Sequence, residues 1–176
     1  ELKKLGLKLN KEKTKRGKIE KQFEFLGYKF ENKSITIAEK NFQKKINAIA
    51  SKFTWFKNGW LNKSRRPKGL KDNDNKFKAR FINELNNIIT GVIIKNQKRS
   101  FLDYYREITD LSILFRLDSI VTRFFENTEP FHEKPDDVKS FVRAFHEIKR
   151  NRKTTYITNL DKIYEIKDKR KLLIKF

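Results

Sequence analysis

The chain has no cysteine, no methionine and only two histidines, His132 and His146, among its 176 residues. Without cysteine it forms neither disulfides nor thiolate metal sites, and neither histidine has carboxylate partners at metal-ligand spacing. These absences argue against a zinc protein. Because the chain also lacks an initiator methionine, we expect it to have been processed or cut from a longer polypeptide.

Long apolar runs are missing as well. No uninterrupted apolar stretch approaches the ~20 residues needed to span a bilayer. The N-terminus also lacks the apolar core of a signal peptide. We therefore expect a cytoplasmic protein that does not insert into a membrane.

Acidic residues are scarce relative to basic ones. The sequence has 43 Lys and Arg against 22 Asp and Glu, which gives a net charge of +21. A surplus of this size attracts polyanions, with nucleic acid as the first candidate and an anionic membrane surface as the second. Since 176 residues suffice for one domain or two small ones with a buried core, composition favours a folded nucleic-acid-binding protein.

Two segments near the N-terminus alternate apolar with polar or small residues, as half-buried strands do. The first contains Leu5, Leu7 and Leu9. The second runs from residue 23 to 37 and is interrupted by Gly27 and a polar turn at 31–34, which together predict a β-hairpin. A glycine inside such a run is typical of a bulge or a close backbone approach.

Past Ala38 the apolar residues recur at helical spacing, and four helices are predicted. The tail is less regular, with strand-forming residues at 156–158 and a short helical pattern at 160–166. The first predicted helix runs from Ala38 to Asn58, and the second carries Phe77 to Val92 and ends near residues 95–99. The third runs from 101 to 125 with Phe115 in its apolar stripe, and the fourth starts at Asp136 and Asp137.

Two adjoining motifs occur in this N-terminal part. The first reads Leu5-Gly6-Leu7-Lys8-Leu9-Asn10-Lys11-Glu12-Lys13-Thr14, and the second reads Phe25-Leu26-Gly27-Tyr28. In order and spacing they resemble the L-G-L-x-L-N-x-x-K-T palm motif and the F-L-G-Y motif of bacterial reverse transcriptases, including retron, group II intron and defence-associated members. The resemblance implies that the chain is the downstream end of an RNA-directed DNA polymerase.

The resemblance implies a catalytic role for Lys13. In the family, the motif lysine lies near the departing pyrophosphate and is proposed to protonate it. A lysine suits this role because its ammonium group also neutralises charge on the leaving group. Taken without its motif, Lys13 is one of many solvated lysines, and Lys11 stands where the family often has proline.

The resemblance further implies that Phe25, Leu26, Gly27 and Tyr28 form the primer grip. Such a turn lays its backbone against the primer and positions the primer's 3′ end without reading sequence. The alternative is an ordinary hairpin packed on the core. Both interpretations can hold together, because Phe25 is expected to pack on the core in part.

The family's metal-binding aromatic-x-Asp-Asp hairpin is absent from the sequence. Asp136 and Asp137 follow a proline and are typical of a helix N-terminus, and nothing near Asp72 and Asp74 completes a cation site. No metal site is therefore predicted in this chain. A polymerase reaction with dNTP substrates would need Mg²⁺ bound by residues outside the chain, on an upstream palm and fingers segment or on a partner chain.

Basic residues cluster in two further places, where we predict phosphate contacts with the nucleic-acid duplex. The alternative for such a run is a solvated face. Of the two tryptophans, Trp55 is expected to anchor the loop on the core, and Trp60 either stacks on a base or anchors the loop. The predicted contact residues are Lys44, Lys45 and Lys52 on the outer face of the first helix, Trp60 where it stacks on a base, and Lys63, Arg65, Arg66 and Lys68 in the loop that follows.

Together these observations predict an α+β fold, mostly α. We expect a palm edge and primer-grip hairpin over residues 1–38, a helical thumb over 39–128 with a basic loop at 57–76, and a helical extension with a tail over 129–176. A looser resemblance to helices of reverse-transcriptase thumbs begins at Tyr104, Tyr105 and Arg106.

The expected function is that of the palm and thumb portion of a reverse transcriptase in the bacterial cytoplasm, with an RNA template and a DNA primer or product as partners. Antiphage defence is favoured over intron mobility, because the chain has no zinc or H-N-H endonuclease tail. The alternative is a non-catalytic RNA- or DNA-binding module, such as a maturase-like thumb or a subunit of a split polymerase. A binder of anionic membranes is a third possibility.

Overall fold

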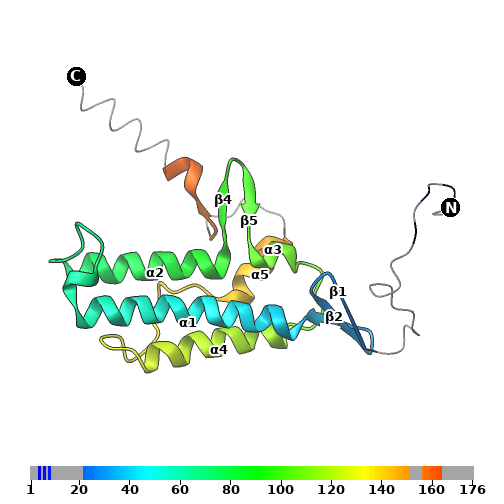
Figure 1. Cartoon of the computed structure of the whole chain (residues 1–176), viewed down its shortest axis with the longest axis horizontal. Helices are drawn as coiled ribbons and strands as arrows, with labels where there is room; N and C mark the ends of the chain where they lie inside the picture. Colours follow the sequence, from blue (N-terminus) through cyan, green and yellow to red (C-terminus); the bar gives the residue numbers. More distant parts are fainter. Residues whose placement is uncertain (1–3, 5, 7, 9–21, 151–155, 164–176) are drawn as a thin grey trace, which may run out of the picture.

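Three long helices lie side by side along the long axis of the molecule: α1 (Glu39–Leu61), α2 (Asp74–Thr90) and α4 (Ser112–Glu126) (Figure 1). The computed structural model describes residues 4, 6, 8, 22–150 and 156–163. α1 packs against both α2 and α4. A shorter helix, α5 (Phe141–Lys149), packs against α2, α4 and the single-turn helix α3 (Phe101–Tyr104).

Two small sheets accompany the helices. The first is an antiparallel meander of β1 (Phe23–Phe25), β2 (Tyr28–Glu31) and β3 (Ser34–Ile37), next to the start of α1 (Figure 1). The second has the strand order β5-β4-β6. In it, β4 (Val92–Ile94) pairs with β5 (Gln97–Arg99) in an antiparallel hairpin and with β6 (Thr158–Asn159) in parallel. A 3-10 helix, η1 (Lys63–Arg65), follows α1.

Phenylalanine dominates the core between the three long helices. The ring centroid of Phe81 on α2 lies 4.4 Å from that of Phe56 and 5.1 Å from that of Phe53, both on α1. Phe125 of α4 meets Phe53 edge-on at 4.9 Å. Each of these side chains is almost fully buried, and such burial stabilises the fold by roughly 2–3 kcal/mol per ring. The same core continues into α5 through Phe141, beyond the predicted start of the extension at residue 129.

The predicted fold class is confirmed: the chain is α+β, mostly α, with small hairpin sheets. The prediction for the end of the second helix is wrong, because α2 stops at Thr90 and residues 92–99 form the β4–β5 hairpin. Val92, Ile93 and Ile94 favour a strand through their β-branched side chains. The turn residues Lys95 and Asn96 have φ of +51° and +56°, as a two-residue hairpin turn requires.

The predicted third helix is also wrong as a single element. It is split into α3 and α4 by residues 105–111, because this connection binds the first sheet. The backbone N–H groups of Thr109 and Asp110 donate to the Ile35 carbonyl at 2.9 and 3.2 Å, and Ile35 N–H donates to the Thr109 hydroxyl at 2.9 Å. A continuous helix would use those backbone groups internally and leave β3 without its partners.

The fourth helix begins later than predicted. α5 starts at Phe141, with the Ser140 side chain accepting from the Arg143 N–H, and Asp136 and Asp137 lie in the preceding turn. In the tail, the strand is at Thr158–Asn159, so it shares only Thr158 with the strand predicted at 156–158. Residues 160–163 are helical, in agreement with the short helix predicted from residue 160.

Candidate nucleic-acid interface

The F-L-G-Y segment forms a two-residue hairpin turn between β1 and β2. Phe25 pairs with Tyr28, which leaves Leu26 and Gly27 as the turn residues with φ of +48° and +81°. Turns with both central residues in this left-handed region match the twist of the flanking strands. A leucine in that conformation is strained by roughly 1 kcal/mol, so the contacts around the turn must hold it there.

Hydrogen bonds supply those contacts. The Ala38 N–H, just before α1, donates to the Gly27 carbonyl at 2.8 Å. The Tyr104 hydroxyl of α3 donates to the Leu26 carbonyl at 2.7 Å, and the Tyr28 hydroxyl donates back to the Tyr104 carbonyl. The turn is therefore fixed to two helices that are far apart in the sequence.

A side chain at position 27 would force its neighbours to move. A Cβ there would lie 2.5 Å from Nδ2 of Asn41 and 2.7 Å from the Tyr105 hydroxyl oxygen. The Tyr105 ring meets the Tyr28 ring edge-on, with centroids 5.1 Å apart. Burial raises the pKa of both Tyr28 and Tyr105 above the ordinary tyrosine value, which already lies well above 7, so both hydroxyls are neutral at pH 7 and can donate. The glycine thus lets the turn lie directly against the helical bundle.

The side chains at the tip of the hairpin face solvent. Phe25 is 63% exposed and Leu26 is 66% exposed. The expectation that Phe25 packs partly on the core is therefore wrong. Phe23, on the same face of β1, stacks on Phe30 of β2 with ring centroids 4.7 Å apart. The hairpin presents an apolar tip on a backbone that is held from behind.

Lys13 lies outside the described residues, as does most of the motif that contains it. The structure therefore gives no geometry for the predicted general acid. Among the residues it does describe, no group of three or more His, Cys, Asp or Glu side chains could hold a metal ion.

The three lysines predicted on the outer face of α1 have different environments. Lys44 is exposed, as predicted. Lys45 is not on that face: its Nζ donates to the Ile88 carbonyl of α2 at 2.5 Å and lies 4.8 Å from the Phe101 ring centroid. Burial lowers the pKa of Lys45 to about 8. Lys45 therefore joins α1 to α2 and is not available to phosphate.

Lys52 is also engaged within the protein. Its Nζ forms an ion pair with Glu84 of α2 and lies 4.4 Å from the ring centroid of Trp55. Although partial burial raises the pKa of Glu84, hydrogen bonds from Lys52 and Arg80 hold it below its usual value. The prediction that Lys52 lies on an open basic face is therefore wrong. Trp55 packs on Phe77 at 5.1 Å, which agrees with its expected anchoring role.

The basic loop after α1 contains one buried arginine. Arg66 is only 3% exposed, and its guanidinium donates to the Gly59 carbonyl at 2.7 Å and to the Asp74 carboxylate at 2.5 Å. The hydrogen bond from Arg66 lowers the pKa of Asp74. Arg66 therefore joins the end of α1 to the start of α2, and the prediction that it contacts phosphate is wrong for this conformation.

Trp60 is half-buried and belongs to the same cluster. Its ring stacks on Phe56 with centroids 5.7 Å apart, and the charged groups of Arg66 and Lys78 lie 5.5 and 5.2 Å from its centroid. Of the two roles expected for Trp60, anchoring the loop is the one that these contacts support.

Four of the predicted contact residues remain exposed: Lys44, Lys63, Arg65 and Lys68. Lys63 lies 3.6 Å from the Asp74 carboxylate but stays 59% exposed, so that pair is weak. The hairpin and the loop that carries the last three residues lie at opposite ends of the helical bundle (Figure 1).

Sequence reasoning did not identify the residues that fix the hairpin. Tyr104 and Asn41 lie outside the two motifs, although Tyr104 and Tyr105 begin the segment with a looser resemblance to thumb helices. The two consecutive tyrosines were the available signal, because a tyrosine combines an apolar ring with a hydrogen-bonding tip.

Within the described part of the chain, none of the helices combines the length and the apolar character needed to cross a membrane. Comparison with known proteins finds no matching protein-family model, no matching curated protein and no matching solved structure.

Proposed function

We propose that the chain binds a primer–template duplex as the primer-grip and thumb portion of a bacterial RNA-directed DNA polymerase. The observation that carries this proposal is the position of two surfaces at opposite ends of α1: the fixed F-L-G-Y turn and the exposed cations of the loop (Figure 1). α1 has 23 residues and is therefore about 34 Å long. That length matches about ten base pairs of duplex.

In this proposal the hairpin positions one strand of the duplex. The backbone around Leu26 and Gly27 is held by the Tyr104 hydroxyl and the Ala38 N–H, so the turn meets the strand in a preset geometry. Contacts of this kind position a primer end without reading its sequence. The exposed side chains of Phe25 and Leu26 face the same ligand.

The duplex then extends along α1 toward the loop. Lys44 contacts it near the hairpin, and Lys63, Arg65 and Lys68 contact phosphates at the far end. Among the described residues, the one ion pair that any of these four forms is the 3.6 Å contact of Lys63 with Asp74, so their charges are available to phosphate. The net charge of +21 adds a long-range attraction for the polyanion.

Catalysis would require groups from outside the described residues. Lys13 would protonate the leaving pyrophosphate. The described residues do not fit Mg²⁺, since they contain no acidic cluster for it. We therefore place the metal ligands and the dNTP pocket on an upstream segment or on a partner chain.

A non-catalytic binding module is the second candidate function. Two features support it. The described residues contain no acidic cluster that could hold a metal ion, and the exposed lysines and arginines can bind RNA without an active site. The two candidates differ in what they expect of Lys13. A module binds with a steep salt dependence and has no activity that depends on that residue.

Binding itself is tested by titrating a labelled primer–template duplex with the purified chain at several salt concentrations. We expect the affinity to fall steeply with salt, and the slope to decrease by about one unit for each of Arg65→Gln and Lys68→Gln. Lys162→Gln, far along the chain from this surface, serves as the matched control. Salt-independent binding, or equal slopes in all variants, would exclude this surface.

The catalytic role is tested in the polymerase assembled with its upstream segment. Lys13→Ala is expected to slow nucleotide incorporation while primer–template affinity stays nearly unchanged, whereas Lys11→Ala, two residues away, leaves the rate unchanged. Loss of rate and affinity together, or of neither, would remove Lys13 from the chemistry and favour the non-catalytic module.

A further inference from the structure

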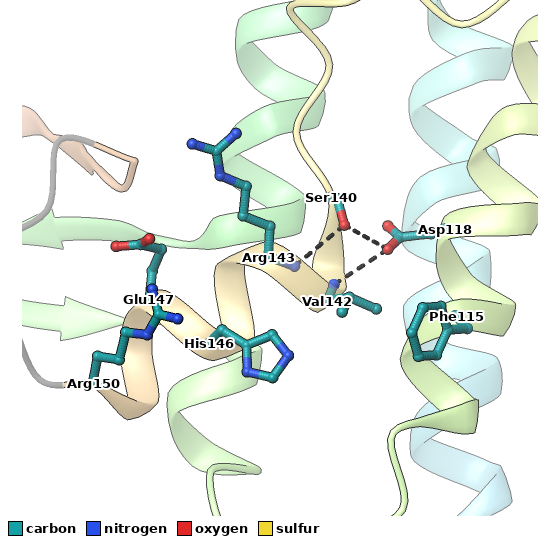
Figure 2. A pocket seen from close by; sticks show the side chains of 8 residues that line it. All are labelled: Phe115, Asp118, Ser140, Val142, Arg143, His146, Glu147 and Arg150. Carbon is teal, nitrogen blue, oxygen red and sulfur yellow. Dashed lines mark hydrogen bonds between the residues drawn. The ribbon is translucent and has the colours of Figure 1, made fainter.

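A cleft of about 560 Å³ lies between α4 and α5 (Figure 2). It is separate from the hairpin turn and from the loop after α1. Its walls include two rings: Phe115 projects from α4, and His146 projects from α5 on the other side. The sequence placed Phe115 in an apolar stripe, yet this side chain is 58% exposed. That prediction is wrong, because the cleft separates Phe115 from α5.

Phe115 differs from the phenylalanines of the core in its exposure. The core contains eight almost fully buried phenylalanines, whereas Phe115 leaves most of its ring open to the cleft. A flat, open ring in a groove is suited to stack on another flat ring. Stacking of a nucleobase on such a side chain tolerates any sequence, because every base has a π-face.

Two arginines, one on α5 and one directly after it, line the same cleft. Arg143 and Arg150 are both exposed, and among the described residues neither forms an ion pair with an acid. The guanidinium of Arg143 lies 4.7 Å from the ring centroid of Tyr156, which orients it without neutralising its charge. Planar guanidinium groups bind phosphate oxygens through paired hydrogen bonds.

The cleft also contains two acids, and one of them is already satisfied. The Asp118 carboxylate accepts from the Ser140 hydroxyl at 2.7 Å and from the N–H groups of Phe141 and Val142 at 2.7 and 3.2 Å (Figure 2). Its charge is thus balanced by the start of α5. Glu147 has no such partners among the described residues, so it opposes an anionic ligand and lowers its affinity.

The cleft lies close to the first sheet along the chain. The N–H groups of Thr109 and Asp110, just before α4, hydrogen-bond to Ile35 of β3. Phe115 follows within the first turns of α4. The wall of the cleft is therefore linked to the sheet that carries the hairpin, so a strand bound at the hairpin has the cleft within reach.

We propose that this cleft binds an unpaired nucleotide of a single-stranded segment next to the duplex, with the base stacked on Phe115 and its phosphates contacted by Arg150 and Arg143. This inference rests on the proposed nucleic-acid binding and adds a second surface to it. The overall charge of +21 favours a polyanion over an apolar peptide, which is the other ligand class that an open phenyl ring suits.

The test compares three labelled ligands by fluorescence anisotropy: a blunt duplex, the same duplex with a single-stranded overhang, and that overhang with abasic sites in place of its bases. We expect the wild-type chain to bind the natural overhang more tightly than the blunt duplex. Phe115→Ala should weaken binding of the overhang duplex roughly tenfold, and the wild-type chain should bind the abasic overhang about as weakly. Phe115→Tyr should keep the advantage.

Charge variants give a second readout. Arg150→Gln should weaken binding of the overhang and Glu147→Gln should strengthen it, while the blunt duplex is unaffected by either. Arg123→Gln is the matched control, because Arg123 is exposed on α4 and does not line the cleft. Opposite effects of two substitutions in one cleft cannot arise from a general loss of folding.

The outcomes separate this inference from the proposed function. If the chain binds duplex but Phe115→Ala leaves the overhang advantage intact, the inference is wrong and duplex binding stands; the cleft would then belong to another class of ligand. If Phe115→Ala weakens blunt and overhang duplex equally, the specificity for unpaired bases is wrong. If the wild-type chain binds none of the three ligands, both proposals are wrong.

Discussion

The Asp118 carboxylate on α4 accepts a hydrogen bond from the Ser140 hydroxyl at 2.7 Å, across 22 residues of sequence. The same carboxylate accepts from the first backbone N–H groups of α5, so a side chain of one helix caps the next one. Charge-assisted hydrogen bonds of this kind are stronger than neutral ones. The contact fixes the angle between α4 and α5 and hence the shape of the cleft between them.

Asp118→Ala is therefore expected to lower the free energy of unfolding by about 3 kcal/mol, because several donors at the start of α5 lose their acceptor. Asp118→Asn should lower it less, since the amide oxygen still accepts. Urea denaturation measures both variants. Glu126→Gln, exposed at the end of the same helix, is the control and should stay within about 0.5 kcal/mol of the wild type. Equal effects of Asp118→Ala and Glu126→Gln would show that the cap contributes nothing.

Gly27 provides a second prediction, with Gly69 as its matched control. Both residues have positive φ, +81° and +88°, but a Cβ at position 69 would meet nothing within 4 Å, whereas one at position 27 would meet Asn41 and Tyr105. Gly69→Ala should cost only the backbone strain, about 1 kcal/mol. Gly27→Ala should cost that strain and also separate the hairpin from the bundle, about 3 kcal/mol in all.

The difference between these two variants isolates the close approach of the turn to the helices. Urea denaturation gives the two free energies, and hydrogen exchange at the β1–β2 strands reports whether the hairpin itself loosens. If both alanine variants lose the same stability, the close approach of the turn to Asn41 and Tyr105 is unimportant and the hairpin is held by its hydrogen bonds alone.

Periodicity in the sequence predicted the long helices well because their cores depend on local spacing. The apolar stripe of α1 contains Phe42, Phe53 and Phe56, and all three are buried. Helix ends were harder to predict. The stripe of α2 continues into Val92, but three β-branched residues followed by a two-residue turn form a hairpin there instead.

Features that depend on distant partners could not be read from local sequence. The break between α3 and α4 exists because Thr109 binds Ile35, which lies 74 residues earlier. Likewise, Lys44 and Lys45 are adjacent in sequence, and only the position of α2 decides that Lys45 is covered. The hairpin turn was predicted from its motif, whereas its anchors on α3 were not.

Arg65 and Arg66 form a natural pair for separating binding from stability. Arg66 is buried and hydrogen-bonded to Gly59 and Asp74, so Arg66→Gln should lower the free energy of unfolding by about 3 kcal/mol. Arg65 is exposed, so Arg65→Gln should change stability by less than about 0.5 kcal/mol. Thermal or urea unfolding checks both values. An Arg66→Gln chain as stable as the wild type would mean that the loop does not depend on this arginine.

Lys45 gives the last prediction, because its stability contribution depends on pH in a known direction. Its folded-state pKa is about 8, while the value in an unfolded chain is near 10.5. Below pH 8 the charge is present in both states, and the cost of burying it is fully felt. Between pH 8 and 10.5 the folded state releases this proton first, so the penalty falls and stability rises with pH.

Lys45→Met removes that titration and keeps most of the apolar contact with Phe101. The stability gained by this variant over the wild type at pH 7 should therefore shrink by about 2.5 kcal/mol as the pH reaches 10. Urea denaturation of both chains at pH 7 and pH 10 measures this change. The other lysines titrate alike in the variant and the wild type, so their contribution cancels in the difference. Lys44→Met, its exposed neighbour, should follow the wild type at every pH. If Lys45→Met also runs parallel to the wild type, then Lys45 keeps its proton in the folded chain and has enough solvent contact to remain a candidate for binding phosphate.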